Sequence, residues 1–345
     1  MLLRDWAERD LKSTVCMAAA LCAALALSGC GSGVANLLPG ATQPAAGVPS
    51  GPTLGYVFSA SDGTLRAMMG VRGSARMSAS IVPAGVYVAG EASTASSTAL
   101  LEDGATTLFA FNLPLSQPMH VADNLPSHAQ IVFAPSGKTA IAYVAGGSTI
   151  TVISGLPGNP QVQTRSVAGA GALVSAVVSD GGAIVMVAQG SPMAVGTLSA
   201  AGQFSRLTTV AAVGGMSFVP GSDDVLIADS GANTAAVLRS VSSSASVQPL
   251  TVAGLNQPVA IAGSQDKRWA VIANGGDGGV FRVDLTAGTA VARLNCACQP
   301  AVLSALAGGG AFRMNSLYGG PVWTIDLMNA SPQLLFVPAI AKGTP

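Results

Sequence analysis

The chain has 345 residues, of which 50% are hydrophobic and only 9% charged, and its 16 basic side chains balance its 16 acidic ones. Nucleic-acid binding needs a concentrated basic footprint, so this charge balance excludes nucleic acid as a partner. The 42 glycines and the low aromatic content (5%) favour many short strands joined by tight turns.

The first residues have the pattern of a secretory leader. Residues 15–27 carry no charge, follow Arg4, Arg9 and Lys12, and are shorter than the ~20 residues needed to span a bilayer. Three acidic residues lie among the basic ones, which departs from the usual positive start, so Met17 is an alternative to Met1 as the true start. We expect residues 1–29 to be a signal peptide.

The stretch Leu27-Ser28-Gly29-Cys30 resembles the bacterial lipobox. The resemblance implies cleavage between Gly29 and Cys30 and attachment of lipid to the Cys30 thiol, which would anchor the chain to a membrane. An ordinary secretory signal with a chance cysteine is the alternative. Gly31, in place of Asp, implies the outer membrane by the same resemblance. Residues 30–53 are uncharged and rich in Gly, Pro, Ala and Ser, so we expect them to form a flexible tether.

Five later segments repeat one pattern of apolar strands and Gly-rich turns. Their equivalent turn residues are Pro135, Ser179, Pro220, Ser264 and Ala307, at spacings of 44, 41, 44 and 43 residues. Four strands in a little over 40 residues is the period of a propeller blade. Continuous apolar runs such as AIVMV and WAVIA fit strands buried on both faces, and no helical periodicity follows residue 30.

The pattern is looser before Pro135. Residues 80–125 are expected to form one more four-stranded unit, with a polar insertion at 91–97. Residues 54–71 read as a single hairpin, which we assign to the last two strands of a blade. Six full units and a hairpin favour seven blades, one of them incomplete, over six blades with an accessory hairpin. We therefore predict an all-β propeller of four-stranded blades over residues 54–339, followed by a tail at 340–345.

Several stretches of the repeats resemble a known class. LIADSGANTAAVLRSV from Leu226, VIANGGDGGVFRVDL from Val271 and the PSGK turn at Pro135 resemble NHL- and YVTN-type bacterial propellers. The opening LGYVFSASDGTLRAMMGVRG, from Leu54, resembles a group of uncharacterised bacterial propeller lipoproteins. These resemblances cover nearly the whole mature chain, and they imply a fold rather than an activity.

Four polar residues lie in loops that join second to third strands: Asp229, Asn233, Asn274 and Asp277. In a propeller such loops collect on one face around the axis, and their oxygen atoms suit a hard cation such as calcium. Gluconolactonase-like propellers, which this fold resembles, use Glu, Asn and Asp around an axial metal for lactone hydrolysis. The alternative is that these residues only form turns, because Asn and Asp tolerate left-handed backbone geometry.

Two cysteines remain after the leader and Cys30, and they lie close together as Cys296 and Cys298. Thiols outside the cytoplasm tend to oxidise, so we expect a disulfide here. A reduced pair and a metal site are the alternatives; the metal site lacks a histidine nearby in sequence.

The sequence favours binding over catalysis. A Ser-His-Asp triad needs a histidine, and His120 and His128 read as a surface pair. Asp284 and Asp326, at matching third-strand positions, read as acids that hold the next turn. We predict a lipid-anchored, monomeric cell-envelope propeller that binds a protein or small molecule on a loop face. A metal-dependent lactonase- or esterase-like hydrolase and a purely architectural envelope protein are the alternatives.

Overall fold

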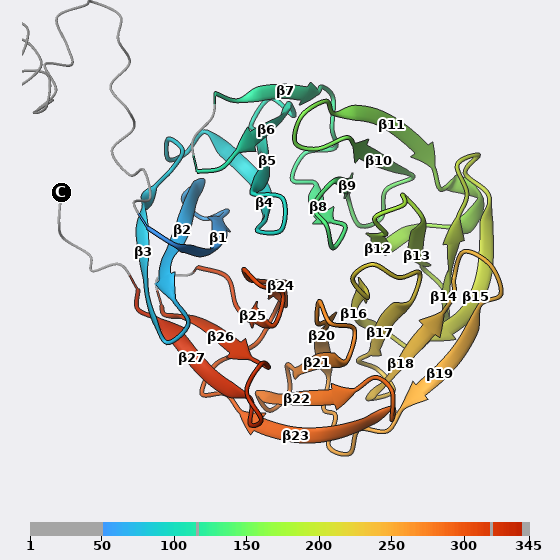
Figure 1. The fold of residues 1–345 in the computed structure, drawn as a ribbon. Helices are drawn as coiled ribbons and strands as arrows, with labels where there is room; N and C mark the ends of the chain where they lie inside the picture. The colour runs from blue at the N-terminus through green and yellow to red at the C-terminus, as the bar shows by residue number, and fades with distance from the viewer. Residues whose placement is uncertain (1–50, 115–116, 318–319, 340–345) are drawn as a thin grey trace, which may run out of the picture. The chain divides into compact units, whose positions relative to one another are not determined.

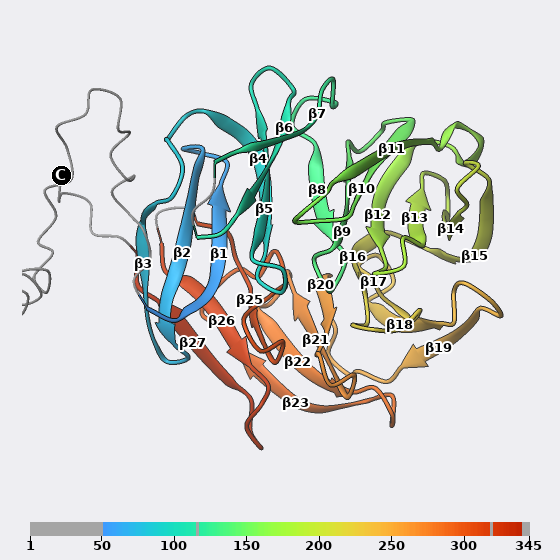
Figure 2. The same ribbon diagram turned by 45° about the horizontal axis from the view of Figure 1, so that its top comes forward.

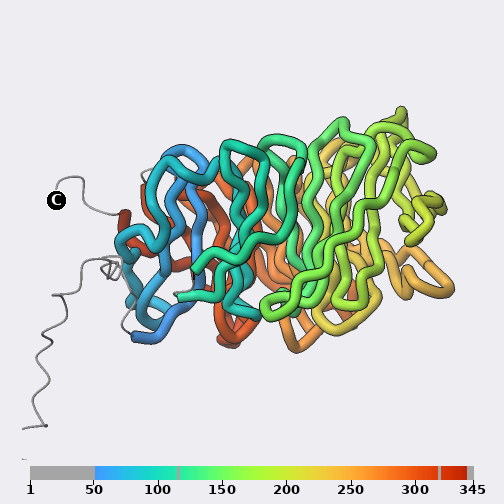
Figure 3. The backbone as a smooth tube through the Cα atoms, turned by 90° about the horizontal axis from the view of Figure 1, so that it is seen from above, coloured from blue at the N-terminus to red at the C-terminus, as the bar shows by residue number. Residues whose placement is uncertain are grey.

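The structure is a computed structural model that describes residues 51–114, 117–317 and 320–339. These residues form an all-β propeller of seven blades around an axis (Figure 1), and an edge-on view places the connecting turns at its two faces (Figure 3). Within the described ranges, no helix is long and apolar enough to cross a membrane. The predicted signal peptide, Cys30, most of the predicted tether and the tail at 340–345 lie outside the described residues.

Each blade is an antiparallel sheet built from strands that are consecutive in the chain. The first three blades contain β1 (Thr53–Ser59), β2 (Thr64–Val71) and β3 (Ser74–Ser80); β4 (Tyr87–Ser93), β5 (Thr98–Asp103), β6 (Leu108–Asn112) and β7 (Met119–Ala122); and β8 (Gln130–Phe133), β9 (Thr139–Tyr143), β10 (Thr149–Ser154) and β11 (Gln161–Ser166). A short 3-10 helix, η1 (Ala168–Ala170), leads into the fourth blade.

The last four blades each have four strands. They contain β12 (Leu173–Val178), β13 (Ile184–Ala188), β14 (Met193–Leu198) and β15 (Phe204–Val210); β16 (Val213–Phe218), β17 (Val225–Asp229), β18 (Thr234–Arg239) and β19 (Ser246–Leu250); β20 (Pro258–Gly263), β21 (Trp269–Asn274), β22 (Gly279–Asp284) and β23 (Thr289–Asn295); and β24 (Ser304–Ala305), β25 (Ala311–Arg313), β26 (Val322–Asp326) and β27 (Gln333–Val337).

The position of a strand in its blade explains its sequence. The second strands β9, β13 and β17 are buried along their whole length, because neighbouring blades cover both of their faces. The fourth strands lie at the rim, where β23 alternates exposed and half-buried residues and β11 is mostly exposed (Figure 1). Continuous apolar runs therefore mark the middle of each blade, and polar alternation marks its outer edge.

The hydrophobic core is divided among the contacts between blades. The buried apolar residues of the described chain fall into seven clusters, and each cluster joins one pair of neighbouring blades. One of them packs Val57 and Met68 of the first blade against Ala311 and Val322 of the seventh. The ring is therefore closed, and the predicted propeller with seven blades is confirmed.

The repeated turn residues lie at equivalent places. Each occupies the first or second position of the β-turn between a first and a second strand. The turns close through the hydrogen bonds Gly137 N to Ala134 O, Gly182 N to Ser179 O, Ser222 N to Val219 O, Lys267 N to Ser264 O and Gly309 N to Leu306 O, at 2.9 to 3.2 Å.

Among the described residues, the first blade has three strands, and the innermost strand is the missing one. The strand β3 contacts β27, the rim strand of the neighbouring seventh blade, just as the rim strands β7 and β11 of two other neighbouring blades contact each other. Figure 1 likewise draws β3 at the rim of the ring. The strand β3 is therefore the fourth strand of its blade, and β1 and β2, which precede it in the sheet, are the second and third strands.

The assignment of residues 54–71 to the last two strands of a blade was therefore wrong. A further strand, β3, follows them at the rim and lies beside β27 (Figures 1 and 2). A rim strand is only partly buried, so its sequence, SARMSAS, needs no continuous apolar run. For this reason the apolar pattern of the sequence did not predict β3.

The seventh blade contacts the inner side of the first blade directly. Ala307 N donates to Leu54 O (2.7 Å), and the guanidinium of Arg72 binds both Ala307 O (3.2 Å) and the Asp326 carboxylate (3.2 Å). These contacts join the two ends of the propeller without a strand shared between sheets.

Candidate functional site

Asp229, the first of the predicted calcium ligands, ends β17 and is held by the main chain. Its carboxylate oxygens accept hydrogen bonds from the N–H groups of Ala211, Ala212, Gly231 and Ala232, at 2.7 to 3.1 Å. Burial opposes ionisation of this side chain, but the four donors outweigh burial and lower the pKa of Asp229. The residue ties the start of its own blade to the turn that follows β17.

The other three predicted ligands also make turn contacts. Asn233 has a positive φ of 55°, and its Oδ1 accepts a hydrogen bond from Gln257 N (2.6 Å). The Nδ2 of Asn274 donates to Gly254 O and to Asp277 Oδ1, both at 3.0 Å. The Asn233 contact connects the fifth blade to the start of the sixth, whereas the Asn274 contacts hold the turn of the sixth blade and the connection that leads into it.

Asp277 and Asn274 differ in what their remaining atoms contact. The Asn274 amide, Gly279 N–H and Arg293 lower the pKa of Asp277, whose Oδ2 lies 3.0 Å from Arg293. Asn274 is fully buried, and its Oδ1 has no hydrogen-bond partner among the described residues. In the same residues, no three His, Cys, Asp or Glu side chains gather in a group that could hold a metal. Calcium at these four residues stays a prediction.

The cysteines and the two third-strand aspartates that the sequence analysis singled out make contacts that hold turns together. Cys296 and Cys298 are joined by a disulfide directly after β23, and Cys296 N donates to Gly278 O (2.9 Å). The Asp284 carboxylate accepts hydrogen bonds from the N–H groups of the turn that follows it, as does that of Asp326.

The two histidines have different surroundings. His120 lies on exposed β7, with its Nε2 2.9 Å from Asp123. The main-chain N–H of His128, together with that of Ala129, binds the fully buried carboxylate of Glu102 at 2.8 to 3.0 Å. His128 therefore contributes its backbone to the contact between the second and third blades.

An ion pair near the axis was missed by the sequence analysis. Glu91 of β4 and Arg313 of β25 lie 3.6 Å apart, and we call them the hub pair. Arg313 is 3% exposed; it donates to Asn315 O and Ser304 Oγ, both at 2.9 Å, and its Nε has no partner among the described residues. The polar insertion predicted at 91–97 was wrong in its first part, since residues 91–93 belong to the inner strand β4 and only residues 94–97 form the turn before β5.

The hub pair connects blades that are not neighbours in the ring. Glu91 belongs to the second blade and Arg313 to the seventh, and among the described residues the first blade between them has no inner strand. Burial raises the pKa of Glu91, against the attraction of Arg313 and a hydrogen bond from Ala92 N–H. A lone acid in an otherwise small and apolar inner strand is the signal that points to this position in the sequence.

A groove of about 610 Å³ lies where the first and seventh blades meet at the rim, and we call it the seam groove. Phe336 borders this groove and is 56% exposed, and its ring centroid lies 5.6 Å from that of Trp323, which packs toward the sixth blade. Arg76 is the only charged residue of the lining. The lining consists of Gly51, Pro52, Met69, Gly70, Gly73, Ser74, Ala75, Arg76, Leu334, Leu335, Phe336 and Pro338.

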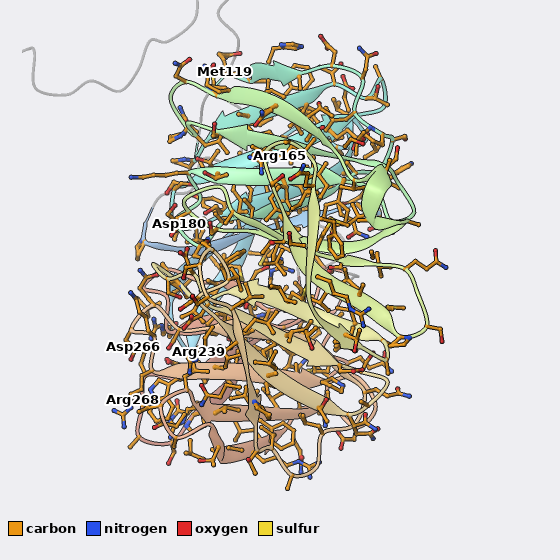
Figure 4. The ribbon with its side chains drawn as sticks, turned by 90° about the vertical axis from the view of Figure 1, so that its right-hand side faces the viewer. Met119, Arg165, Asp180, Arg239, Asp266 and Arg268 are labelled. Carbon is orange, nitrogen blue, oxygen red and sulfur yellow. A yellow bond between two sulfur atoms is a disulfide. The ribbon has the colours of Figure 1, made fainter. Side chains whose placement is uncertain are left out.

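A second groove, of about 380 Å³, lies between the third and fourth blades. Its walls are polar and include Arg165 and Asp180, which Figure 4 labels on the side of the ring that faces the viewer. Arg165 donates to Gly182 O at 3.5 Å, and Asp180 accepts from Ser136 N at 2.8 Å. These bonds link the two blades, so the seam groove is the better candidate for a binding surface.

The closed ring of seven antiparallel sheets defines a seven-bladed β-propeller, and solved structures share this fold. A functionally unknown protein from Desulfotomaculum acetoxidans is 13% identical with a TM-score of 0.60, covering 84% of this chain and 96% of that protein. Virginiamycin B lyase from Staphylococcus aureus is 11% identical with a TM-score of 0.55, covering 74% and 85%. Identities this low show the fold alone. No family model and no curated protein matches the sequence.

Proposed function

We propose that this chain is a lipid-anchored cell-envelope propeller, of the NHL or YVTN type, that acts as a non-catalytic binding platform. The lipobox-like stretch ending at Cys30 supports the anchor, and Gly31 supports the outer membrane as its location. In this proposal the protein is a monomer that is attached to the membrane through its N-terminal lipid.

The seam groove is the observation that carries the binding role. An exposed apolar surface can mark a site of interaction. The lining of the groove includes the half-buried apolar residues Met69, Leu334 and Leu335. The groove lies on a scaffold whose core joins every blade to the next, so its shape is held before any partner binds.

Labelling with radioactive palmitate tests the anchor, and affinity retention tests the platform. The parent chain should incorporate palmitate and fractionate with the outer membrane, whereas Cys30→Ala should do neither. The detergent-solubilised parent chain, immobilised, should retain a defined envelope protein that heat-denatured chain does not retain. A chain that takes up no label at Cys30 contradicts the anchor. A chain that is labelled at Cys30 but retains no envelope protein supports the purely architectural role instead.

One atom favours a second candidate function. The fully buried Oδ1 of Asn274 has no partner in the described chain, and an amide oxygen is a ligand that calcium accepts. On this basis a calcium-dependent hydrolase of lactones or esters is the second proposal. Calcium and zinc contents of the purified protein, with thermal unfolding in each metal, test it; neither metal bound and no thermal shift would contradict it.

A further inference from the structure

We propose that the ring opens at the boundary between the first and seventh blades, and that Arg72 is the latch that keeps this boundary closed. We call the boundary the seam. The inference goes beyond the proposed function and does not rest on it. The open form is a minor state of the native protein, so the closed ring remains the dominant form.

Among the described residues, the seam is the one boundary between blades that the chain does not cross. No sheet in this part of the chain shares a strand across the seam. The first and seventh blades are therefore held together without a covalent connection, and they can part while the other boundaries hold. The chain crosses those other boundaries at residues 81–86, 123–129, 167–172, 211–212, 251–257 and 296–303.

Few main-chain contacts hold the seam. A single main-chain hydrogen bond crosses it in the described residues, from Ala307 N to Leu54 O (2.7 Å). At the rim, β3 and β27 leave the seam groove of about 610 Å³, which is larger than the groove of about 380 Å³ between the third and fourth blades. The connection from the fifth to the sixth blade is held more firmly, since Thr251 N donates to Gly288 O (2.7 Å) and Thr251 O accepts from Ala290 N (3.1 Å). We therefore expect the seam to part first.

Arg72 makes the ionic contact across the seam. It follows β2 of the first blade, and its guanidinium donates to the Asp326 carboxylate and to Ala307 O of the seventh blade, both at 3.2 Å. The Arg72 side chain is 28% exposed and that of Asp326 only 8%, so water competes for this pair in part. Because charged groups form the stronger hydrogen bonds, the Arg72 contacts should be the main polar barrier to opening.

The first two blades should move together when the seam opens. Residues 81–86 connect them, and one apolar cluster packs Tyr56 and Leu65 of the first blade against Leu101 and Phe111 of the second. The hub pair links the second blade to the seventh, so it must part together with the Arg72 contacts. Opening then exposes the buried apolar residues of the seam to solvent, which makes the open form measurable.

Thiol labelling at buried positions measures the opening. Ala311 of β25 is 2% exposed and packs across the seam, whereas Ala228 of β17 is fully buried between the fifth and sixth blades. Full-length, detergent-purified Ala311→Cys and Ala228→Cys proteins are labelled with a maleimide under native conditions, and peptide mass spectrometry counts only label at the new position. We expect label to enter at position 311 about tenfold faster or more than at position 228, with a weaker dependence on denaturant.

Hydrogen exchange gives the same test without a substitution. The Ala307 N–H is bonded across the seam, and the Thr251 N–H is bonded within a boundary that the chain crosses. In the unmodified protein, the Ala307 N–H should exchange faster than the Thr251 N–H. This measurement keeps the opening testable if a buried cysteine disturbs the fold.

Arg72→Met tests the latch. Removing the hydrogen bonds of a charged group should raise the labelling rate at position 311 about tenfold and leave the rate at position 228 unchanged. Arg239→Met is the matched control, because Arg239 is also paired with an acid, Asp224, and donates to Leu285 O of the next blade (3.0 Å). The chain crosses that boundary, so Arg239→Met should leave the rate at position 311 unchanged.

A second pair of variants removes the acid of the contact instead. Asp326→Asn keeps an oxygen for Met328 N and removes the charge that faces Arg72, so it should also raise the labelling rate at position 311. Asp284 ends the third strand of the sixth blade as Asp326 does in the seventh, and its carboxylate holds only its own turn among the described residues. Asp284→Asn should therefore leave the rate at position 311 unchanged.

The opening and the latch can fail separately. Equal labelling rates at positions 311 and 228, with the same dependence on denaturant, would overturn the opening, as would an Ala307 N–H that exchanges more slowly than that of Thr251. A labelling rate at position 311 that Arg72→Met leaves unchanged, or that Arg239→Met raises equally, would overturn Arg72 as the latch.

Discussion

The hub pair offers a quantitative test of how the ring is held near its axis. Arg313→Met removes the cation and leaves Glu91 with no partner for its charge. Breaking a buried pair by removing one partner costs about 3–5 kcal/mol. The Glu91 side chain is 31% exposed, so solvent offsets part of this cost and we expect about 2–3 kcal/mol. At roughly 2 °C per kcal/mol for a domain of this size, the thermal midpoint should fall by about 4–6 °C.

A double-mutant cycle isolates the pair from the loss of packing. Glu91→Gln should cost less than Arg313→Met, because it leaves no uncompensated negative charge. The combination of Glu91→Gln with Arg313→Met should be more stable than the sum of the two single effects predicts. Chemical denaturation at pH 7 measures all three variants. Additive effects within 0.5 kcal/mol, or an Arg313→Met protein as stable as the parent, would refute the ionic link.

The pH dependence of the same pair has a defined sign. Burial raises the pKa of Glu91 above its ordinary value of 4.5. The resulting contribution to stability is complete below pH 4.5 and is lost as the pH rises through the raised pKa. Relative to Glu91→Gln, the parent should therefore lose stability over that rise in pH, as measured by denaturation at several pH values. A difference that stays constant or runs the other way contradicts the burial of Glu91.

Three further outcomes are expected. Asp229→Ala leaves four main-chain donors without their acceptor, and chemical denaturation should show a loss of about 1–3 kcal/mol in stability. Because the pKa of Asp229 is lowered, its contribution to stability is present above pH 3.8 and is lost as the pH falls further. The Asp229→Ala protein should not show this loss at low pH. Asn274→Ala should abolish any calcium-induced thermal shift of the parent, and a shift that persists would remove Asn274 as a ligand. Alkylation followed by mass spectrometry should find Cys296 and Cys298 unmodified until a reductant is added, and free thiols beforehand would contradict the disulfide.

The propeller could be predicted because its middle strands carry a clear signal. AIVMV of β13 and WAVIA of β21 are buried on both faces, and a turn of recurring chemistry precedes each. Rim strands have no such signal, since SARMSAS of β3 resembles a loop until its neighbours are known. The error in the first blade follows directly from this difference.

The sites were less predictable, because they depend on residues far apart in the chain. The hub pair joins positions 91 and 313, and the seam groove joins residues 74–76 to residues 334–336. Neither pairing leaves a local pattern, so both require knowledge of how the ring closes. Asp229 and Asn233 did attract notice by their residue types, yet those types also suit the turn contacts that they make.

In the described part of the chain, each sheet is built from consecutive strands and none takes a strand from the other end, so assembly can proceed in chain order. Each blade pairs only with itself, and each new blade can pack on the one before it as the polypeptide emerges. Low sequence separation of this kind favours rapid folding. Only the joint between the first and last blades must wait for the final residues, and until then Val57 and Met68 lie open to solvent. A chaperone that assists folding should therefore act before this last joint forms.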